Sequence, residues 1–464
     1  MLDKKIVKGL QKIFRKEDIL TQEKDLVFYQ YDASLDRGMP DAVVFPRSTD
    51  QIVALVKFAR QHRIPLIPRG SGSNLSGGSI AIWGGIIVQF SHMNRILEID
   101  LDNRCAAVEP GVYNLDLQNA LAPYKFYFAP DPASQRVATI GGNVAENAGG
   151  PHCIKYGVTV NHILGLEIVT AEGELLQIGG KSEQYPGYDL LSLVIGSEGT
   201  LGIVTKVIVK ILPLPEAVKT MLAIFNSMEQ AANAVSEIIA RGIIPATLEM
   251  MDKPIIQTVE AAHHLGYPMD AEAVLLVELD GPFAGMESQA EQIKQICLKN
   301  GADKIESAET SDQRDALWKG RRLSFGSLTM LQPSVMIADG TVPRSKVPAV
   351  LKRVMEICDH HQLKVGNVFH AGDGNLHPFI LFDDRNPIDK DKVKQACDEI
   401  LAVCIEHGGT ISGEHGIGLE KKSAMKMLFT NDEIAAMKRI KQVFDPETIF
   451  NPNKIFPVTE ADSL

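Results

Sequence analysis

The sequence predicts an α+β protein with more than one domain, and three observations lead to this fold class. The chain has 464 residues, whereas an ordinary domain has roughly 100–150. Residues 40 to about 215 alternate β-prone segments with glycine-rich turns, and the rest of the chain places helices between strands. Pro213 and Pro215 stand where the pattern changes and predict a domain boundary there.

The first domain is predicted from local patterns. Residues 42–78 predict strand, helix and strand, and the helix carries an apolar stripe formed by Ile52, Leu55, Val56 and Ala59. Strands rich in β-branched residues are expected over 84–90, 105–112, 163–173, 174–180 and 201–215.

The second domain is predicted to be an antiparallel sheet covered by helices. Asn226 and Glu229 have the spacing of a capping box, which predicts a helix that ends before Gly242. Further helices are expected before Gly301 and over 346–362, 389–407 and 434–440.

Composition excludes several classes of protein. The formal net charge of −11 argues against nucleic acid as the main partner, because phosphate binding needs a basic face. No stretch of about 20 apolar residues predicts a membrane span, and the first residues mix charges throughout, so we expect a cytoplasmic chain. The six cysteines have no close CxxC spacing, which argues against an iron–sulfur cluster held by this chain alone.

The segment "HAGDGNLH", residues 370–377, predicts half of a metal site. If Asp373 and Gly374 form a two-residue turn, His370 faces His377 with Cβ atoms roughly 5 Å apart. The segment "SGEHGIG", residues 412–418, adds Glu414 and a further histidine. The alternative is a pair of histidines bonded to backbone or water.

Three glycine-rich stretches in the first domain predict a site for one extended ligand, such as a dinucleotide. They are "PRGSGSNLSGGS" at 68–79, a stretch at 130–159 and "GSEGTLGIVT" at 196–205. Backbone N–H groups in such turns bind phosphate oxygens, and Ser71, Ser73 and Asn74 offer further donors. Leu75 stands where the Rossmann fingerprint has its third glycine, so that fold is not indicated.

With these motifs in this order, the chain resembles the FAD-linked oxidases of the vanillyl-alcohol oxidase, or PCMH-type, superfamily. Within it the likeness is to the flavin subunits of bacterial glycolate oxidase and D-lactate dehydrogenase complexes. The likeness runs from about residue 40 to "FNPNKIF" at 450–456. It implies a PCMH-type two-subdomain FAD-binding domain and an α+β cap domain with an antiparallel sheet. The expected divisions are N-terminal helices over 1–39, the FAD domain over 40–218, the cap domain with the metal site over 219–415, and a C-terminal segment over 416–464 that returns to the FAD domain.

The resemblance also assigns the cofactor site. The FAD pyrophosphate would be held by Pro68, Arg69, Gly70, Ser71, Gly72, Ser73 and Asn74. The rest of the cofactor would be lined by Pro130, Asp131, Ser134, Gly141, Gly142, Asn143, Gly150, Ile203, Val204 and Asn451. Ser73 stands where members with covalent flavin carry a histidine, so we expect FAD bound without a covalent link.

The reaction implied by the family is oxidation of a small D-2-hydroxy acid, glycolate or D-lactate, to the 2-oxo acid, with hydride passing to flavin N5. A divalent metal (Zn, Fe or Mn) on His370, His377 and Glu414 would bind the substrate. His415 would be the base, and Arg321 would bind the substrate carboxylate unless it is a surface arginine like Arg322. An iron–sulfur subunit or an electron-transfer flavoprotein would accept the electrons.

Two alternative functions stay open at this point. The first is a flavin dehydrogenase for another 2-hydroxy acid, such as D-2-hydroxyglutarate. The second is a metallohydrolase that uses His370, His377 and Glu414 to activate water, which leaves the three glycine-rich stretches unexplained.

Overall fold

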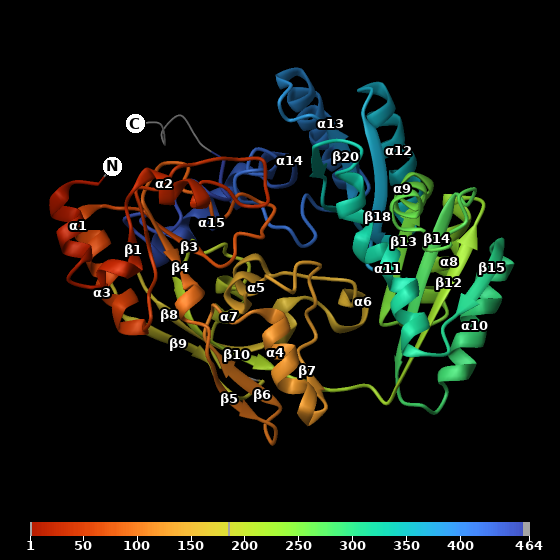
Figure 1. Ribbon diagram of the computed structural model, residues 1–464, viewed down its shortest axis with the longest axis horizontal. Helices are drawn as coiled ribbons and strands as arrows, with labels where there is room; N and C mark the ends of the chain where they lie inside the picture. Colours follow the sequence, from red (N-terminus) through yellow and green to blue (C-terminus); the bar gives the residue numbers. More distant parts are fainter. Residues whose placement is uncertain (1, 184–185, 458–464) are drawn as a thin grey trace. The chain divides into compact units, whose positions relative to one another are not determined.

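The structure is a computed structural model that describes residues 2–183 and 186–457. The chain divides into two compact units. The first unit comprises residues 1–149, 158–214 and 414–464, and the second comprises 150–157 and 215–413. Figure 1 labels the helices and strands of both units. Residues 150–157, which the sequence predicts in the first domain, group with the second unit.

The first unit contains a four-stranded sheet in the order β1-β2-β4-β3. Its strands are β1 (Ile19–Leu20), β2 (Ala42–Val44), β3 (Leu66–Arg69) and β4 (Ile86–Gln89). Helix α3 (Thr49–His62) is capped by Ser48, whose side chain accepts a hydrogen bond from the Gln51 N–H. Its buried residues are the four predicted from the apolar stripe, so this helix and its inner face are confirmed.

A five-stranded antiparallel sheet follows in the first unit, in the order β5-β6-β10-β8-β9. In β10 (Ile203–Lys210) buried and half-buried residues alternate, as expected for a strand with one face on a core. The other strands are β5 (Ile96–Asp100), β6 (Cys105–Val108), β8 (Ile163–Val169) and β9 (Leu175–Gly179). The unit also contains β7 (Phe126–Tyr127), β11 (Leu212–Pro213), α1 (Lys4–Leu10), α2 (Glu23–Leu26), α4 (Asn114–Leu121), α5 (Ile140–Glu146), α7 (Leu190–Val194), α14 (Met425–Leu428) and α15 (Asn431–Phe444).

The C-terminal segment closes the first unit. Phe450 forms a β-bridge with Leu66 at the edge of β3. The Nζ of Lys454 donates hydrogen bonds to the carbonyl oxygens of Gly77 at 2.7 Å and Ile80 at 2.8 Å. The last described residues therefore hold the loop that follows β3.

The second unit is an antiparallel sheet whose main path runs β15-β12-β14-β13-β18-β19-β17, with β16 and β20 paired beside β18. Its strands are β12 (Ala217–Phe225), β13 (Thr247–Asp252), β14 (Ala273–Gly281), β15 (Ala302–Ser307), β16 (Ser334–Ile337), β17 (Gly340–Thr341), β18 (Lys364–His370), β19 (Asn375–Leu376) and β20 (Pro378–Phe382). Its helices are α6 (Cys153–Tyr156), α8 (Met228–Ala240), α9 (Lys253–His263), α10 (Met286–Lys299), α11 (Ser311–Leu328), α12 (Val347–His360) and α13 (Pro387–Glu406).

One predicted helix start was wrong. The capping residue of α8 is Ser227, whose side chain accepts a hydrogen bond from the Gln230 N–H, and Asn226 lies outside the helix. With Ser227 as the capping residue, the third residue of the helix is Gln230. A capping box requires its Glu or Gln to cap from that third position, whereas Glu229 is only the second residue of the helix.

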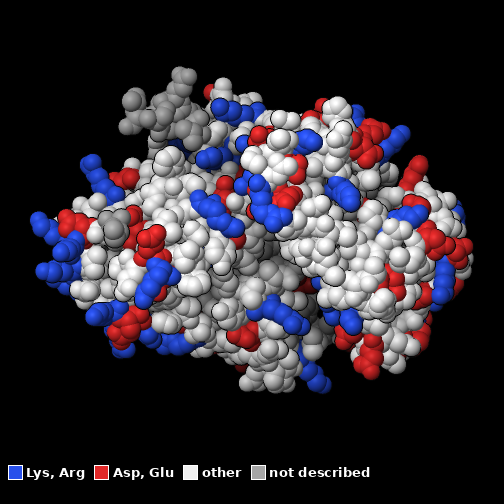
Figure 2. All heavy atoms as spheres, turned by 45° about the horizontal axis from the view of Figure 1, so that its top comes forward, with Lys and Arg blue, Asp and Glu red and all other residues white. Residues whose placement is uncertain are grey.

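Helix hydropathy and surface charge give two further observations. Within residues 2–183 and 186–457, no helix combines the length and the hydropathy that a membrane crossing needs. Figure 2 shows basic and acidic side chains interspersed over the visible face.

Candidate functional site

The hairpin that carries the two histidines has a different register from the predicted one. His370 pairs with Asn375, not with His377, so the loop is the four residues 371–374. A two-residue type I′ turn needs positive φ at both central residues, and here Gly374 has φ 83° whereas Asp373 is not in that region. The Asp373 side chain instead accepts a hydrogen bond from the Asn375 N–H at 3.0 Å.

The two imidazole rings nevertheless converge. Their centroids are 5.1 Å apart with an interplanar angle of 86°, and each residue is 5% exposed. A register change of two residues keeps a side chain on the same face of a sheet, so His377 becomes a diagonal neighbour of His370. Both rings are thus buried side by side in the second unit.

Each histidine has a buried carboxylate beside it. The Nδ1 atom of His370 lies 2.5 Å from Oε1 of Glu249, which stands directly opposite it in the pairing of β13 with β18. The Nδ1 atom of His377 lies 3.8 Å from Oδ1 of Asp339. A carboxylate behind a histidine is the usual arrangement where the other ring nitrogen binds a metal.

Glu249 also binds the arginine predicted for the substrate carboxylate. The Nε of Arg321, on α11, donates a hydrogen bond to Oε2 of Glu249 at 2.5 Å, and the arginine side chain is 13% exposed. Burial alone raises the pKa of Glu249, but the adjacent His370 and Arg321 lower it below its ordinary value. Glu249 thus lies between a ring and a guanidinium, with one partner for each of its oxygens.

The neighbouring Arg322 differs from Arg321 in position. Its side chain is 58% exposed and pairs with Asp315 at 3.3 Å. Its guanidinium lies 5.7 Å from the centre of the Trp318 ring. Arg321 is thus not a surface arginine, and with Nε on Glu249 its two terminal amino groups are the part of the fork that can meet a carboxylate.

The chain that leads to Glu414 is fixed in the second unit as far as Gly413. The Gly413 N–H donates to the backbone oxygen of Asp339 at 3.0 Å and to its Oδ2 at 3.1 Å. A Cβ on Gly413 would lie 2.4 Å from the side chain of Asn375, so a larger residue here requires Asn375 to move. Glu414 and His415 follow directly, and successive Cα atoms are about 3.8 Å apart.

Two groups of potential metal ligands result. They are His370, His377 and Glu414, and Asp339, His377 and His415, and in each group the ligand atoms lie within 4.8 Å of one another. Two imidazoles and a carboxylate suit zinc, ferrous iron or manganese. Sequence reasoning named all of these residues except Asp339, and it also missed Glu249. Neither belongs to a motif, because each reaches the histidines only through strand pairing.

The first glycine-rich loop has the properties of an anion site in its backbone rather than in its side chains. Within the described residues, the N–H groups of Ser71 through Asn74 donate no hydrogen bond. The side chains of Ser71 and Asn74 are already bonded, to Val137 O at 2.5 Å and to Asp32 Oδ2 at 2.9 Å. The part of this loop that fits a pyrophosphate without any rearrangement is therefore its backbone nest, and donation by the two side chains stays a prediction.

The side chain of Arg69 is also engaged. Its Nη1 lies 3.3 Å from Oγ of Ser79, and its guanidinium lies 5.8 Å from the centre of the Tyr29 ring. Arg69 is 6% exposed. The Arg69 side chain is therefore buried beside the loop and bonded to protein atoms.

The second glycine-rich stretch packs against the first. A Cβ on Gly70 would overlap Thr139, whose Oγ1 accepts a hydrogen bond from the Gly142 N–H at 3.1 Å. Asn143 is 2% exposed, and its Nδ2 has no partner within the described residues. An unpaired buried amide next to a glycine pair fits a polar ligand that supplies the missing acceptor.

The remaining cofactor candidates divide between the units. Pro130, Asp131, Ser134 and Gly141 lie in the first unit, with Ile203 and Val204 at the start of β10. Asn451 is 1% exposed, and its Nδ2 donates to Gly78 O and Glu198 O, each at 2.7 Å. Asn451 thereby ties the first glycine-rich stretch to the third. Gly150 is the one candidate in the second unit.

A second group of ionisable residues lies in the first unit. Glu198 is 4% exposed, and its Oε1 accepts a hydrogen bond from the Ile417 N–H at 2.7 Å. Burial raises the pKa of Glu198 to about 7, and burial together with Glu198 raises the pKa of Glu146 well above its ordinary value. Burial also lowers the pKa of Lys454 to about 8.

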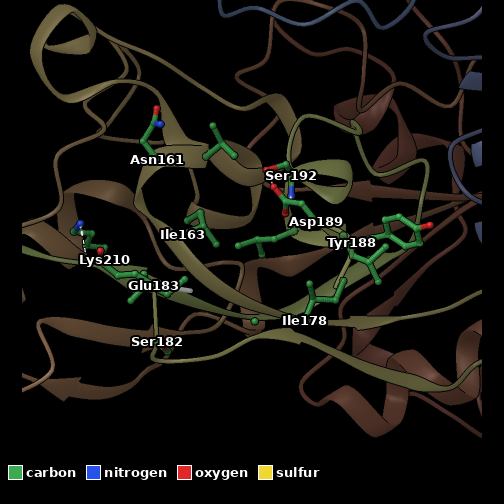
Figure 3. A pocket seen from close by; sticks show the side chains of 14 residues that line it. Asn161, Ile163, Ile178, Ser182, Glu183, Tyr188, Asp189, Ser192 and Lys210 are labelled. Atoms are coloured by element: carbon green, nitrogen blue, oxygen red, sulfur yellow. Dashed lines mark hydrogen bonds and ion pairs between the residues drawn. The ribbon is translucent and has the colours of Figure 1, made fainter. Parts of the chain in front are cut away.

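A cavity of about 500 Å³ in the first unit is separate from these residues (Figure 3). It is lined by parts of β8, β9 and α7, with the Lys210–Glu183 ion pair at one side. None of the candidate residues named above lines it.

The fold and the glycine-rich loops define an FAD-binding protein, and comparisons with known proteins agree. Residues 40–179 match the FAD binding domain, and residues 214–455 match the FAD linked oxidases, C-terminal domain. The chain belongs to the FAD-linked oxidases, and it is an FAD-linked oxidoreductase.

Relatives of known name cover nearly the whole chain. It is 43% identical to the glycolate oxidase subunit GlcD of Bacillus subtilis over 98% of this chain and 97% of that protein. It is 33% identical to the D-lactate dehydrogenase of Archaeoglobus fulgidus over 92% of this chain and 95% of that protein.

The solved structures with a similar fold share little sequence. The 4-ethylphenol oxidase of Gulosibacter chungangensis is 19% identical, with a TM-score of 0.82 over 98% of this chain and 97% of that one. p-Cresol methylhydroxylase is 17% identical, with a TM-score of 0.81 over 97% of this chain and 95% of that one. The predicted fold class and cofactor domain are thereby confirmed.

Proposed function

We propose that this protein oxidises a small 2-hydroxy acid, glycolate or D-lactate, to the 2-oxo acid. The observation that carries the proposal is the 43% identity with glycolate oxidase subunits along almost the entire chain. A D-lactate dehydrogenase among the relatives supports the same substrate class. The match to an FAD binding domain accounts for the glycine-rich loops, which a metallohydrolase would not require.

The proposed substrate site consists of residues of the second unit together with Glu414, which directly follows the last residue of that unit, Gly413. Arg321 binds the substrate carboxylate through its terminal amino groups. His370, His377 and Glu414 hold a divalent metal, which when bound supplies a positive charge that lowers the pKa of the substrate hydroxyl. The burial of both histidines excludes water from their side of the substrate and strengthens these electrostatic interactions.

His415 is the proposed base. It removes the proton from the substrate hydroxyl, so that the Cα–H bond can break with its electron pair. Bound FAD would supply the acceptor for that hydride. The proposed holders of FAD are the backbone of Pro68 through Asn74, the segment from Gly141 to Asn143, and Asn451. FAD binds without a covalent link.

Electrons leave through a partner protein in this proposal. Within the described residues, neither group of potential metal ligands contains a cysteine, which supports an iron–sulfur cluster carried by another protein. The relatives in Bacillus subtilis and Escherichia coli are named as subunits. An iron–sulfur subunit or an electron-transfer flavoprotein is the acceptor that we propose.

The test is the visible spectrum of the purified protein under anaerobic conditions. We expect a flavin spectrum that glycolate or D-lactate bleaches, and we expect prior chelation to prevent the bleaching. A yellow protein that neither acid bleaches would place the substrate elsewhere. Bleaching that chelation leaves unchanged would remove the metal from the mechanism.

A further inference from the structure

We propose that Glu249 is a positioning residue that aligns the metal-binding ring of His370 with the carboxylate-binding guanidinium of Arg321. The inference rests on the proposed function, because it takes those roles for His370 and Arg321. Glu249 itself touches neither the metal nor the substrate in this proposal. It acts through its two neighbours.

The geometry gives each oxygen of Glu249 its own partner. Oε1 lies 2.5 Å from Nδ1 of His370, and Oε2 accepts from Nε of Arg321 at 2.5 Å. Glu249 is 1% exposed, so water does not compete for these oxygens. The carboxylate lies opposite His370 in the sheet, and α11 brings the arginine to it.

The Glu249 carboxylate, whose Oε2 pairs with the guanidinium of Arg321, sets the tautomer of the ring. It can only accept hydrogen bonds, so Nδ1 of His370 must carry the proton. Nε2 then presents its lone pair, which is the form of imidazole that binds a metal. A residue that cannot impose this tautomer weakens the metal site without touching the metal.

The same carboxylate couples the metal to the substrate. A 2-hydroxy acid presents its hydroxyl and its carboxylate at a fixed separation, so the metal and the guanidinium must also stand at a fixed separation. Glu249 is one planar group bonded to both, and it therefore fixes one relative to the other. Productive alignment of this kind is worth large factors in rate.

The second unit offers a matched control. Glu278 on β14 is 1% exposed and accepts two hydrogen bonds from Arg314, Nε to Oε2 at 2.8 Å and Nη2 to Oε1 at 2.7 Å. It is also a buried glutamate paired with an arginine of α11. Among the described residues its carboxylate bonds neither His370 nor His377, so its loss tests the general cost of breaking such a pair.

The experiment uses the full-length protein with FAD bound, freed of metal by chelation, and measures Zn²⁺ binding by calorimetry in Glu249→Gln and Glu278→Gln. The amide that Glu249→Gln introduces has one acceptor and one donor atom, so it cannot accept from both neighbours. If its oxygen stays on Arg321, its NH₂ faces Nδ1 and the ring proton moves to Nε2. We expect Zn²⁺ binding to weaken about 10–100-fold in Glu249→Gln and to remain at the wild-type value in Glu278→Gln.

The outcomes separate this inference from the proposed function. Equal Zn²⁺ affinity in wild type and Glu249→Gln would overturn the inference and leave the metal site standing. If the wild-type protein binds no Zn²⁺, the metal site fails and the inference fails with it. Flavin content and the unfolding curve report on folding. If Glu249→Gln does not fold, Glu249→Asp, whose shorter chain cannot span both partners, is expected to show the same loss, and wild-type affinity in that variant would refute the inference.

Discussion

The backbone N–H of Ile417 donates a hydrogen bond to Oε1 of Glu198 at 2.7 Å. A Cβ on the preceding Gly416 would overlap Glu146 and would lie 3.0 Å from Oε1 of Glu198, so both carboxylates face one short stretch of backbone. Burial disfavours the ionised form of each carboxylate, and the charge of Glu198 further disfavours ionisation of Glu146. The pair therefore retains a proton into the neutral pH range, as the raised pKa values indicate.

This pair predicts how stability depends on pH. An unfolded glutamate titrates near pH 4.3, whereas Glu198 in the folded protein titrates near 7, so the folded state binds more protons between these values. The free energy of unfolding should fall as pH rises through this window, by on the order of 1–3 kcal/mol. Glu146→Gln removes one of the two carboxyl groups whose pKa is raised in the folded protein, so we expect a flatter profile in urea unfolding. The exposed Glu229→Gln is the control, and an unchanged slope in Glu146→Gln would contradict the prediction.

Replacing the proposed base should stop the chemistry and spare the cofactor. In His415→Ala we expect substrate-dependent flavin reduction to slow by about 10²–10⁴-fold, because no group takes the hydroxyl proton. Anaerobic stopped-flow absorbance measures the rate, and the flavin spectrum before mixing shows that FAD is bound. His407, which bonds the carbonyl of Val403 at the end of α13, gives the control His407→Ala. Undiminished reduction in His415→Ala would exclude it as the base.

Arg321→Lys should weaken substrate capture. Lysine keeps a positive charge beside Glu249 but loses the planar fork, which costs about 1.5–3 kcal/mol for hydrogen bonds to a charged group. We expect kcat/KM for glycolate or D-lactate to fall by about 10–150-fold in steady-state kinetics. Arg322→Lys, at the exposed neighbour, should behave as wild type. The same kinetics in both variants would show that Arg321 does not bind substrate.

The flavin should be released by acid. Ser73 offers no imidazole for a covalent bond to the flavin, so precipitation with trichloroacetic acid should leave a colourless pellet and a yellow supernatant. Absorbance of the two fractions is the measurement. Flavin that stays with the pellet would show a covalent link through another residue.

Hydropathy patterns in the sequence correctly predicted elements that depend on neighbouring residues alone. The apolar stripe of α3 and the strand at β10 follow from periodicity, and the structure has both. The turn at Asp373 was predicted wrongly because its side chain caps the Asn375 N–H instead of allowing a type I′ turn. The side chains of Ser71 and Asn74 find protein partners that no local pattern reveals.

The other residues of the candidate site come together through pairing between strands that are far apart in the sequence. Glu249 and His370 are 121 residues apart in the sequence and become neighbours only when β13 pairs with β18. Asp339 likewise gains its place from the strand that follows it and from the Gly413 N–H. Such residues carry no sequence signal unless the sheet order is already known.

The course of the chain also constrains the order in which the protein can fold. The first unit takes its first segment from residues 1–149 and its last from 414–464. Leu66 receives its β-bridge partner, Phe450, only after the residues between them have been made. During synthesis from the N-terminus, residues 215–413 are therefore complete before the loop after β3 gains its support from Lys454. The flavin-binding unit contains residues that are made before the second unit, yet it is not fully paired until residues that follow the second unit have been made.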